Sequence, residues 1–188
     1  MLNFVEVPHV NGLDLAALGE MVEAIEKDPA QAKASFEVAT RWAGQTRSET
    51  VVEGFTLGGK RYDRQHRIVA DEPCELLGTD SAPNPQELLM AAFNACIMVG
   101  YVAGAATKGV RLDSVEIRTR GTLDLRGFLG LSDQVAPGYE AIDYDVRIRG
   151  DGTAEQFEEI HAEVQATSPN FDNLARAIRI DARLEVQS

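Results

Sequence analysis

Residues 84–109, NPQELLMAAFNACIMVGYVAGAATKG, form the longest apolar run of the chain, and no residue between 88 and 106 is charged. Asn84 is a good N-cap, and Glu87 is placed to close a capping box back onto it. Gly109 suits the left-handed residue that commonly follows the end of a helix. The sequence therefore predicts one long, uncharged helix.

A helix that is apolar all round either spans a membrane or is buried on every side in a folded core. Burial fits better, because this run is rich in alanine and glycine and carries Asn94 and Tyr101. Gly100 and Gly104 are expected to let another backbone pack closely. In a chain of 188 residues, the simplest cover is a sheet on one side and a second subunit on the other.

Charge and composition narrow the classes of function. The net charge of −12 argues against nucleic acid as a partner, because binding to phosphates relies on Lys and Arg, and it also disfavours an anionic membrane surface. The first residues do not resemble an export signal, so a cytoplasmic location is expected, with cysteines as free thiols. The scattered His and Cys residues predict no metal site, and no cofactor is expected.

The N-terminal part is predicted to be a separate helical segment. Apolar residues recur at helical spacing over residues 12–34, and Asp28-Pro29 ends or kinks that pattern. We therefore divide the chain into an N-terminal helical extension, residues 1–35, and a main domain, residues 36–188. The extension is expected to dock on the main body or on a partner subunit.

Alternation of apolar and polar residues predicts strands on both sides of the long helix. The predicted strands cover residues 36–42, 50–57, 62–70, 115–125, 142–149 and 178–186. Gly58-Gly59 marks a hairpin turn, and a capped helix is expected from Thr153 to near Ser168-Pro169. Blocks of strands interrupted by single helices indicate an α+β protein.

An unusually apolar loop, residues 126–132, separates two of these strands. Exposed apolar loops often line a binding site or an interface. The alternative is that Phe128 and Leu131 tuck into the core, and the sequence supports both possibilities equally.

Several motifs together resemble the OsmC/Ohr family of thiol-dependent hydroperoxide reductases. In chain order they are Asp71-Glu72-Pro73, Asn84-Pro85-Gln86-Glu87-Leu88-Leu89, Ala91-Ala92-Phe93-Asn94-Ala95-Cys96 and Ser168-Pro169. The resemblance covers about residues 36–188. It implies an OsmC-like α+β fold, in which antiparallel sheets pack around long central helices and two chains intertwine as a homodimer.

The resemblance also implies site residues. In the family's enzymes, a cysteine of the central helix attacks the peroxide oxygen, and an arginine and a glutamate hold this cysteine as a thiolate. A second cysteine then forms a disulfide with the oxidised sulfur. Cys96 matches the attacking cysteine, and Arg47 is the best match to the arginine. Gln86 stands at the acid position and Ser168 at the position of the second cysteine.

Helix geometry bears on the missing acid. At about 100° per residue, Glu87 points roughly 180° away from Cys96, whereas Gln86 lies about 80° from the cysteine's direction and can donate a hydrogen bond. Cys74 lies in a loop away from the family's usual second cysteine. Oxidised Cys96 would need another thiol, so an external thiol reductant is expected.

Two functions stay open at this point. The first is a cytoplasmic, homodimeric thiol peroxidase that reduces an organic hydroperoxide, with Cys96 as nucleophile, Arg47 as activator and Gln86 as a hydrogen-bonding helper. The expected substrate-pocket residues are Phe128, Leu131 and Ser168. The second is a non-catalytic homodimer that binds a small hydrophobic ligand or a partner protein and keeps Cys96 as a small buried hydrophobe.

Overall fold

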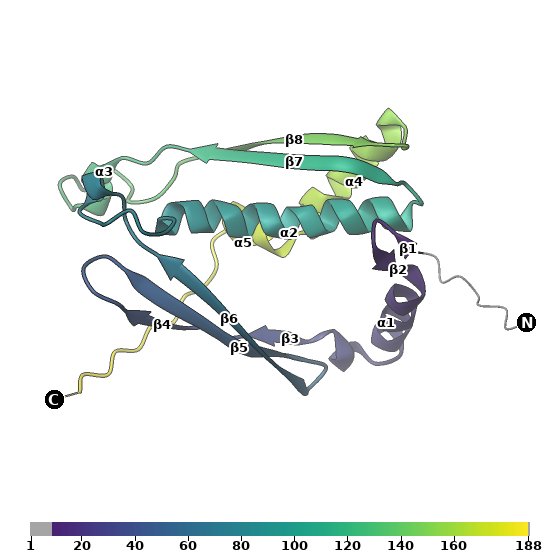
Figure 1. Ribbon diagram of the computed structural model, residues 1–188, viewed down its shortest axis with the longest axis horizontal. Helices are drawn as coiled ribbons and strands as arrows, with labels where there is room; N and C mark the ends of the chain where they lie inside the picture. The colour runs from purple at the N-terminus through teal and green to yellow at the C-terminus, as the bar shows by residue number, and fades with distance from the viewer. Residues whose placement is uncertain (1–8, 188) are drawn as a thin grey trace, which may run out of the picture. The chain divides into compact units, whose positions relative to one another are not determined.

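The computed structural model describes residues 9–187, and the chain divides into two compact units, residues 1–91 and 92–188 (Figure 1). The first unit contains β1 (His9–Val10), β2 (Leu13–Asp14), α1 (Leu15–Lys27), η1 (Pro29–Ala32), β3 (Ala34–Phe36), β4 (Ala39–Trp42), β5 (Ser48–Leu57), β6 (Lys60–Ala70) and η2 (Cys74–Leu76). The long helix α2 (Pro85–Thr107) crosses the division. It is followed in the chain by β7 (Leu112–Gly121), α3 (Leu125–Phe128), β8 (Ile142–Gly150), α4 (Ala154–Thr167) and α5 (Pro169–Ala175).

The first unit is built on a four-stranded antiparallel sheet. The long strands β5 and β6 form its hairpin, and β3 and β4 pair with different parts of the free edge of β5. Gly58 and Gly59 both adopt positive φ at the predicted turn, which confirms the hairpin. The single strand expected over residues 36–42 is broken into β3 and β4 at Glu37-Val38.

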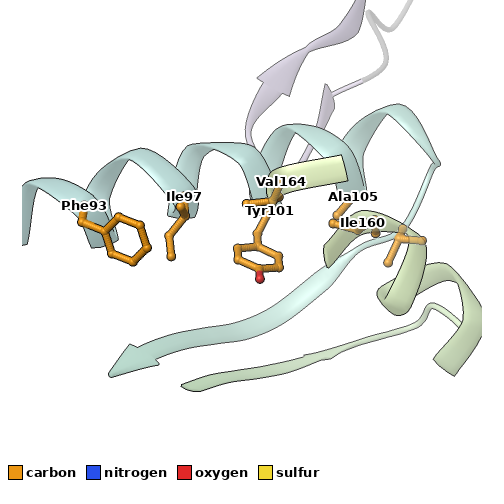
Figure 2. Close-up of a cluster of buried hydrophobic side chains, with 7 residues drawn as sticks. Phe93, Ile97, Tyr101, Ala105, Ile160 and Val164 are labelled. Atoms are coloured by element: carbon orange, nitrogen blue, oxygen red, sulfur yellow. The ribbon is translucent and has the colours of Figure 1, made fainter. Parts of the chain in front are cut away.

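The second unit packs the β7–β8 hairpin against α2 and α4. The α2 side chains Phe93, Ile97, Tyr101 and Ala105 recur every fourth residue and therefore share one helix face. Figure 2 shows this row beside Ile160 and Val164 of α4. These two residues and Val110 are the other buried members of the cluster. Alternate residues of β7 and β8, Val115, Ile117, Tyr144, Val146 and Ile148, pack against it.

The predicted caps of α2 are confirmed. The Glu87 N–H donates to Asn84 Oδ1 at 2.8 Å, and the Asn84 N–H donates to Glu87 Oε2 at 2.8 Å. Gly109 follows the helix with φ +69°, a left-handed conformation that glycine adopts without steric cost.

The two glycines of α2 allow the close helix contact that the sequence predicts. A Cβ atom at Gly100 would lie 3.0 Å from Val164 Cγ2, and one at Gly104 would lie 3.2 Å from Ile160 Cγ2. The helix packed on them is therefore α4 of the same chain.

Helix α2 is buried on one face only. Tyr101 is 1% exposed, whereas Val99 is 68% exposed, so the expected burial on every side is not reached within one chain. Among residues 9–187, α2 is the one helix long and apolar enough to cross a membrane by length and composition. Core helices of soluble proteins meet the same criterion, so this property is weak evidence for a span.

The structure differs from the prediction at three places: the end of one strand, an additional helix and a strand that does not form. Strand β7 ends at Gly121 and does not reach Leu125, because Asp124 accepts from the Arg126 N–H and caps the short helix α3. A helix that was not predicted, α5, follows Ser168. Residues 178–186 form no strand, and Ile180 and Leu184 are 84% and 90% exposed. A strand needs hydrogen-bonding neighbours, and this segment has no strand partner in the described part of the chain.

Candidate functional site

Cys96 lies on α2 between the buried residues Phe93 and Ile97, and its side chain is half-buried. Its Sγ lies 3.4 Å from the hydroxyl oxygen of Ser168, which is only 6% exposed. Two residues separated by most of the second unit are thus in direct contact. The thiol has a polar neighbour and is not sealed in a purely apolar shell.

Ser168 holds this position because it begins α5. Its side-chain oxygen accepts the Phe171 N–H at 3.3 Å, and Pro169 occupies the first helical position. A hydroxyl has one proton to donate. Either the hydroxyl or the thiol can therefore be the donor in this contact, and the hydroxyl is the donor when Cys96 is a thiolate.

Two further contacts fix the segments around the thiol. Asn170 Nδ2 donates to the Ala92 carbonyl at 2.9 Å and joins α5 to α2. Thr119 Oγ1 donates to Asn94 Oδ1 and joins β7 to α2. These bonds lie within one helical turn of Cys96, so the backbone that carries the sulfur is held on two sides.

Arg47 lies in the first unit, at the end of the turn between β4 and β5. Its Nη2 donates to Glu49 Oε1 at 3.0 Å, and Glu49 Oε2 lies 3.7 Å from Arg67 Nη1. Arg47 Nε is buried and has no hydrogen-bond partner among the described residues. Glu49 therefore anchors the guanidinium, and one N–H remains free for another acceptor.

Glu49 is a partner of Arg47 that the sequence motifs do not single out. Arg47 directly precedes β5, and Glu49 is the second residue of that strand, a spacing at which side chains of an extended chain point to the same face. That alternation was the signal that could have found the pair.

The other predicted site residues are exposed. Gln86 lies exposed in the first turn of α2. Phe128, in α3, and Leu131, just after it, are each 71% exposed, so the alternative that they tuck into the core is wrong. Cys74 is an exposed free thiol in η2.

Asp71 is the most deeply buried charged residue of the first unit, at 1% exposed. Hydrogen bonds from Thr79, Thr46 and Ser81 hold the pKa of its carboxyl well below the usual range. This carboxylate lies at the end of β6, where the chain enters the loop that leads to α2.

Comparison with models of protein families shows the family to which this chain belongs. The family model described as OsmC-like protein matches residues 78–183, more than half of the chain, including Cys96 and Ser168. The chain belongs to the OsmC-like family. OsmC-like proteins are soluble. A search of the curated proteins finds no match to this chain.

Solved structures agree on the fold. An OsmC-like protein from Mycoplasma pneumoniae is 13% identical, with a TM-score of 0.59 over 75% of this chain and 87% of that one. An OsmC-like protein of unknown function from Vibrio cholerae is also 13% identical, with a TM-score of 0.57 over 73% of this chain and 92% of that one. The predicted OsmC-like α+β fold is confirmed.

Proposed function

We propose that this OsmC-like protein is a thiol-dependent organic hydroperoxide reductase with a single redox-active cysteine. The observation that carries the proposal is the contact between Cys96 Sγ and the Ser168 hydroxyl. A hydroxyl donor beside a sulfur can stabilise the negative charge of a thiolate, which is the nucleophilic form of cysteine. Serine has no sulfur, so it cannot resolve the oxidised cysteine as a disulfide.

The proposed reduction of the hydroperoxide runs in three steps. The Cys96 thiolate attacks one peroxide oxygen, the O–O bond breaks, and the leaving alkoxide takes a proton and departs as an alcohol. The sulfur is oxidised by two electrons to sulfenic acid. An external thiol displaces water from the sulfenic sulfur to form a mixed disulfide, and a second thiol regenerates Cys96 and releases the oxidised reductant.

Arg47 is the proposed activator, a role that requires its guanidinium to come close to the Cys96 sulfur. A buried donor without a partner costs about 1–3 kcal/mol, so the free Arg47 Nε–H favours a role in binding an anion such as a thiolate or a peroxide oxygen. Glu49 supplies the anionic anchor that Gln86 cannot supply. Gln86 keeps the proposed role of a neutral hydrogen-bonding helper.

The proposed substrate is an organic hydroperoxide with an apolar group. The side chains of Phe128 and Leu131 are exposed and uncharged, as a surface that contacts such a group requires. Ser168 is the polar end of the proposed pocket, next to the reacting sulfur.

The proposed active form is a cytoplasmic homodimer. No hydrophobic side chain of residues 9–91 is buried, so the faces of the first sheet need a cover that one chain does not provide. The exposed face of α2 has the same need. We propose that a second copy covers both and that residues 178–186 become a strand in that assembly.

The test follows the consumption of cumene hydroperoxide, with dithiothreitol or a dihydrolipoyl thiol as reductant. Wild type and Cys74→Ser are expected to consume peroxide at similar rates, and Cys96→Ser is expected to be inactive. Hydrogen peroxide should be a poorer substrate than the organic hydroperoxide. Equal inactivity of wild type and Cys96→Ser with several peroxides and thiols would remove the enzymatic proposal.

A second candidate is a non-catalytic dimer that binds a small hydrophobic ligand or a partner protein. The exposed apolar residues Phe128, Leu129 and Leu131 favour it, because they can bind an apolar molecule without any redox chemistry. Binding of a fluorescent fatty acid that persists in Cys96→Ser, together with the absence of peroxidase activity in wild type, would support this candidate.

A further inference from the structure

The buried carboxylate of Asp71 joins two segments of the first unit. Its Oδ1 accepts from Thr46 Oγ1 at 2.7 Å and from the Glu72 N–H at 2.9 Å. Its Oδ2 accepts from the N–H and the hydroxyl of both Thr79 and Ser81. One oxygen is therefore bonded to the β4–β5 turn, and the other is bonded to the loop before α2.

The bond to the turn has a specific consequence because Thr46 directly precedes Arg47. Arg47 closes this turn, since its N–H donates to the Gly44 carbonyl at 2.9 Å and its carbonyl accepts from Ala43. Gln45 Nε2 also donates to the Leu77 carbonyl at 2.7 Å and ties the same turn to the same loop. The backbone of Arg47 is thus fixed from the side of the loop.

The two ends of the Arg47 side chain are held differently. Glu49 and Arg67 form an ion network around the guanidinium, in which Arg67 is exposed and Arg47 and Glu49 are half-buried, and ion pairs that water reaches contribute little to rigidity. The backbone end is held by Asp71, whose carboxylate is buried and is fixed by hydrogen bonds from several donors, although Thr46 itself is exposed. Placement of the guanidinium therefore depends on Asp71 at the backbone end as well as on Glu49 at the charged end.

We propose that Asp71 is a positioning residue for Arg47, which it holds through the Thr46 hydroxyl. This inference rests on the proposed function, because the aim of Arg47 matters for catalysis only if Arg47 activates Cys96. Asp71 itself takes no part in proton transfer or in substrate contact.

The test compares two substitutions that each remove one hydroxyl donor from the same carboxylate. Thr46→Val removes the side-chain bond between the turn and Asp71. Ser81→Ala is the matched control, because the Ser81 N–H still donates to Oδ2 at 3.1 Å and the loop stays attached. Amide hydrogen exchange of residues 43–47 is expected to rise several-fold in Thr46→Val and to stay unchanged in Ser81→Ala.

The catalytic readout is kcat/KM for cumene hydroperoxide. Thr46→Val is expected to lose about tenfold, within the range that misplacement of a catalytic group costs, and Thr46→Ser is expected to restore the rate. In an Arg47→Ala background, Thr46→Val should have no additional effect, because the group that it positions is gone.

The outcomes separate the two claims. Equal exchange in Thr46→Val and Ser81→Ala, or an undiminished loss of rate when Thr46→Val is added to Arg47→Ala, would overturn the positioning role. If wild type lacks peroxidase activity, the proposed function fails. The positioning of the turn is then still decided by the exchange measurement, which needs no activity.

Discussion

The Ser168 hydroxyl oxygen lies 3.4 Å from Cys96 Sγ and also accepts the Phe171 N–H, so one side chain both caps α5 and contacts the thiol. Because of this double role, removing the hydroxyl has two consequences. The helix loses its cap, and the Cys96 sulfur loses its hydroxyl neighbour.

Ser168→Ala is expected to slow the reaction of Cys96 with iodoacetamide and with peroxide at neutral pH by several-fold, because the thiolate loses a hydrogen bond. It should also lower the free energy of unfolding by about 1 kcal/mol through the lost cap. Thr153→Ala is the matched control, since it removes the N-cap of α4, at the opposite end of that helix from Ser168. A similar loss of reactivity in both variants would show that helix stability, and not the hydroxyl donor, sets the reactivity of Cys96.

Ser168→Cys is expected to convert the site into a disulfide-forming one. A sulfur placed where the hydroxyl oxygen lies needs only a small shift to reach Cys96 at the bond length of about 2.0 Å. One equivalent of peroxide should form an intramolecular disulfide, which mass spectrometry detects as a loss of two hydrogens in a Cys74→Ser background. Accumulation of sulfenic or sulfinic acid alone would contradict the geometry of this contact.

Gly100→Ala is expected to destabilise the protein by about 1 kcal/mol, because the new Cβ would lie 3.0 Å from Val164 Cγ2 and overpacking outweighs the gain in helix propensity. Gly19→Ala in α1 is the control. Its Cβ meets nothing within 4 Å, so it should stabilise the helix by about 0.5–1 kcal/mol. Urea unfolding checks both values, and Val164→Ala should relieve part of the cost of Gly100→Ala.

Asp71 is expected to make stability depend on acid pH. Hydrogen bonds led by the one from Thr79 lower its pKa in the folded state below the unfolded value of about 3.9, so its contribution is fully present above that value. The contribution is lost as the pH falls through the lower, folded pKa. Asp71→Asn should be less stable than wild type at pH 7, and the difference should shrink below about pH 4. Asp80→Asn, an exposed change in the same loop, is the control when urea unfolding is followed, and an equal loss of stability at pH 7 in both variants would contradict the role of the Asp71 carboxylate.

The proposed dimer predicts a face-specific effect in residues 178–186. If this segment pairs as a strand in the assembly, its alternating apolar residues face the core and the others face water. Ile180→Asp with Leu184→Asp should raise the dissociation constant of the dimer strongly in sedimentation. Arg183→Ala with Glu185→Ala, on the other face, should leave it unchanged. An unchanged dimer in both double variants would mean that this segment takes no part in the interface.

Local signals were sufficient for the parts of the fold that depend on neighbours in sequence. The Asn84–Glu87 capping box, the Gly58-Gly59 turn and the alternation of β7 and β8 each involve residues a few positions apart or a regular period. Such patterns are visible in any single sequence. The OsmC-like motif around Cys96 added the family and the α+β fold.

Other features depended on contacts between distant segments. Ser168-Pro169 predicts the end of α4, but the same residues also begin α5, because Ser168 caps one helix at its C-terminus and the next at its N-terminus. Residues 178–186 have the alternation of a strand and still form none here, because period alone does not supply a pairing partner. Asp71 gave no sign of its burial, since its donors lie in segments that come together only on folding.

The sequence by itself determined the long uncharged helix, its caps and the Gly58-Gly59 hairpin, because these follow from local period and composition, and its resemblance to the OsmC family placed Cys96 within the family's motif. Only the tertiary structure decided that Ser168 contacts the Cys96 sulfur, that Glu49 anchors Arg47, and that α4 fills the space above Gly100. The physical reason is that a side chain's chemistry depends on which donors and charges lie within a few ångströms of it. Folding sets those distances between segments that the order of residues leaves far apart.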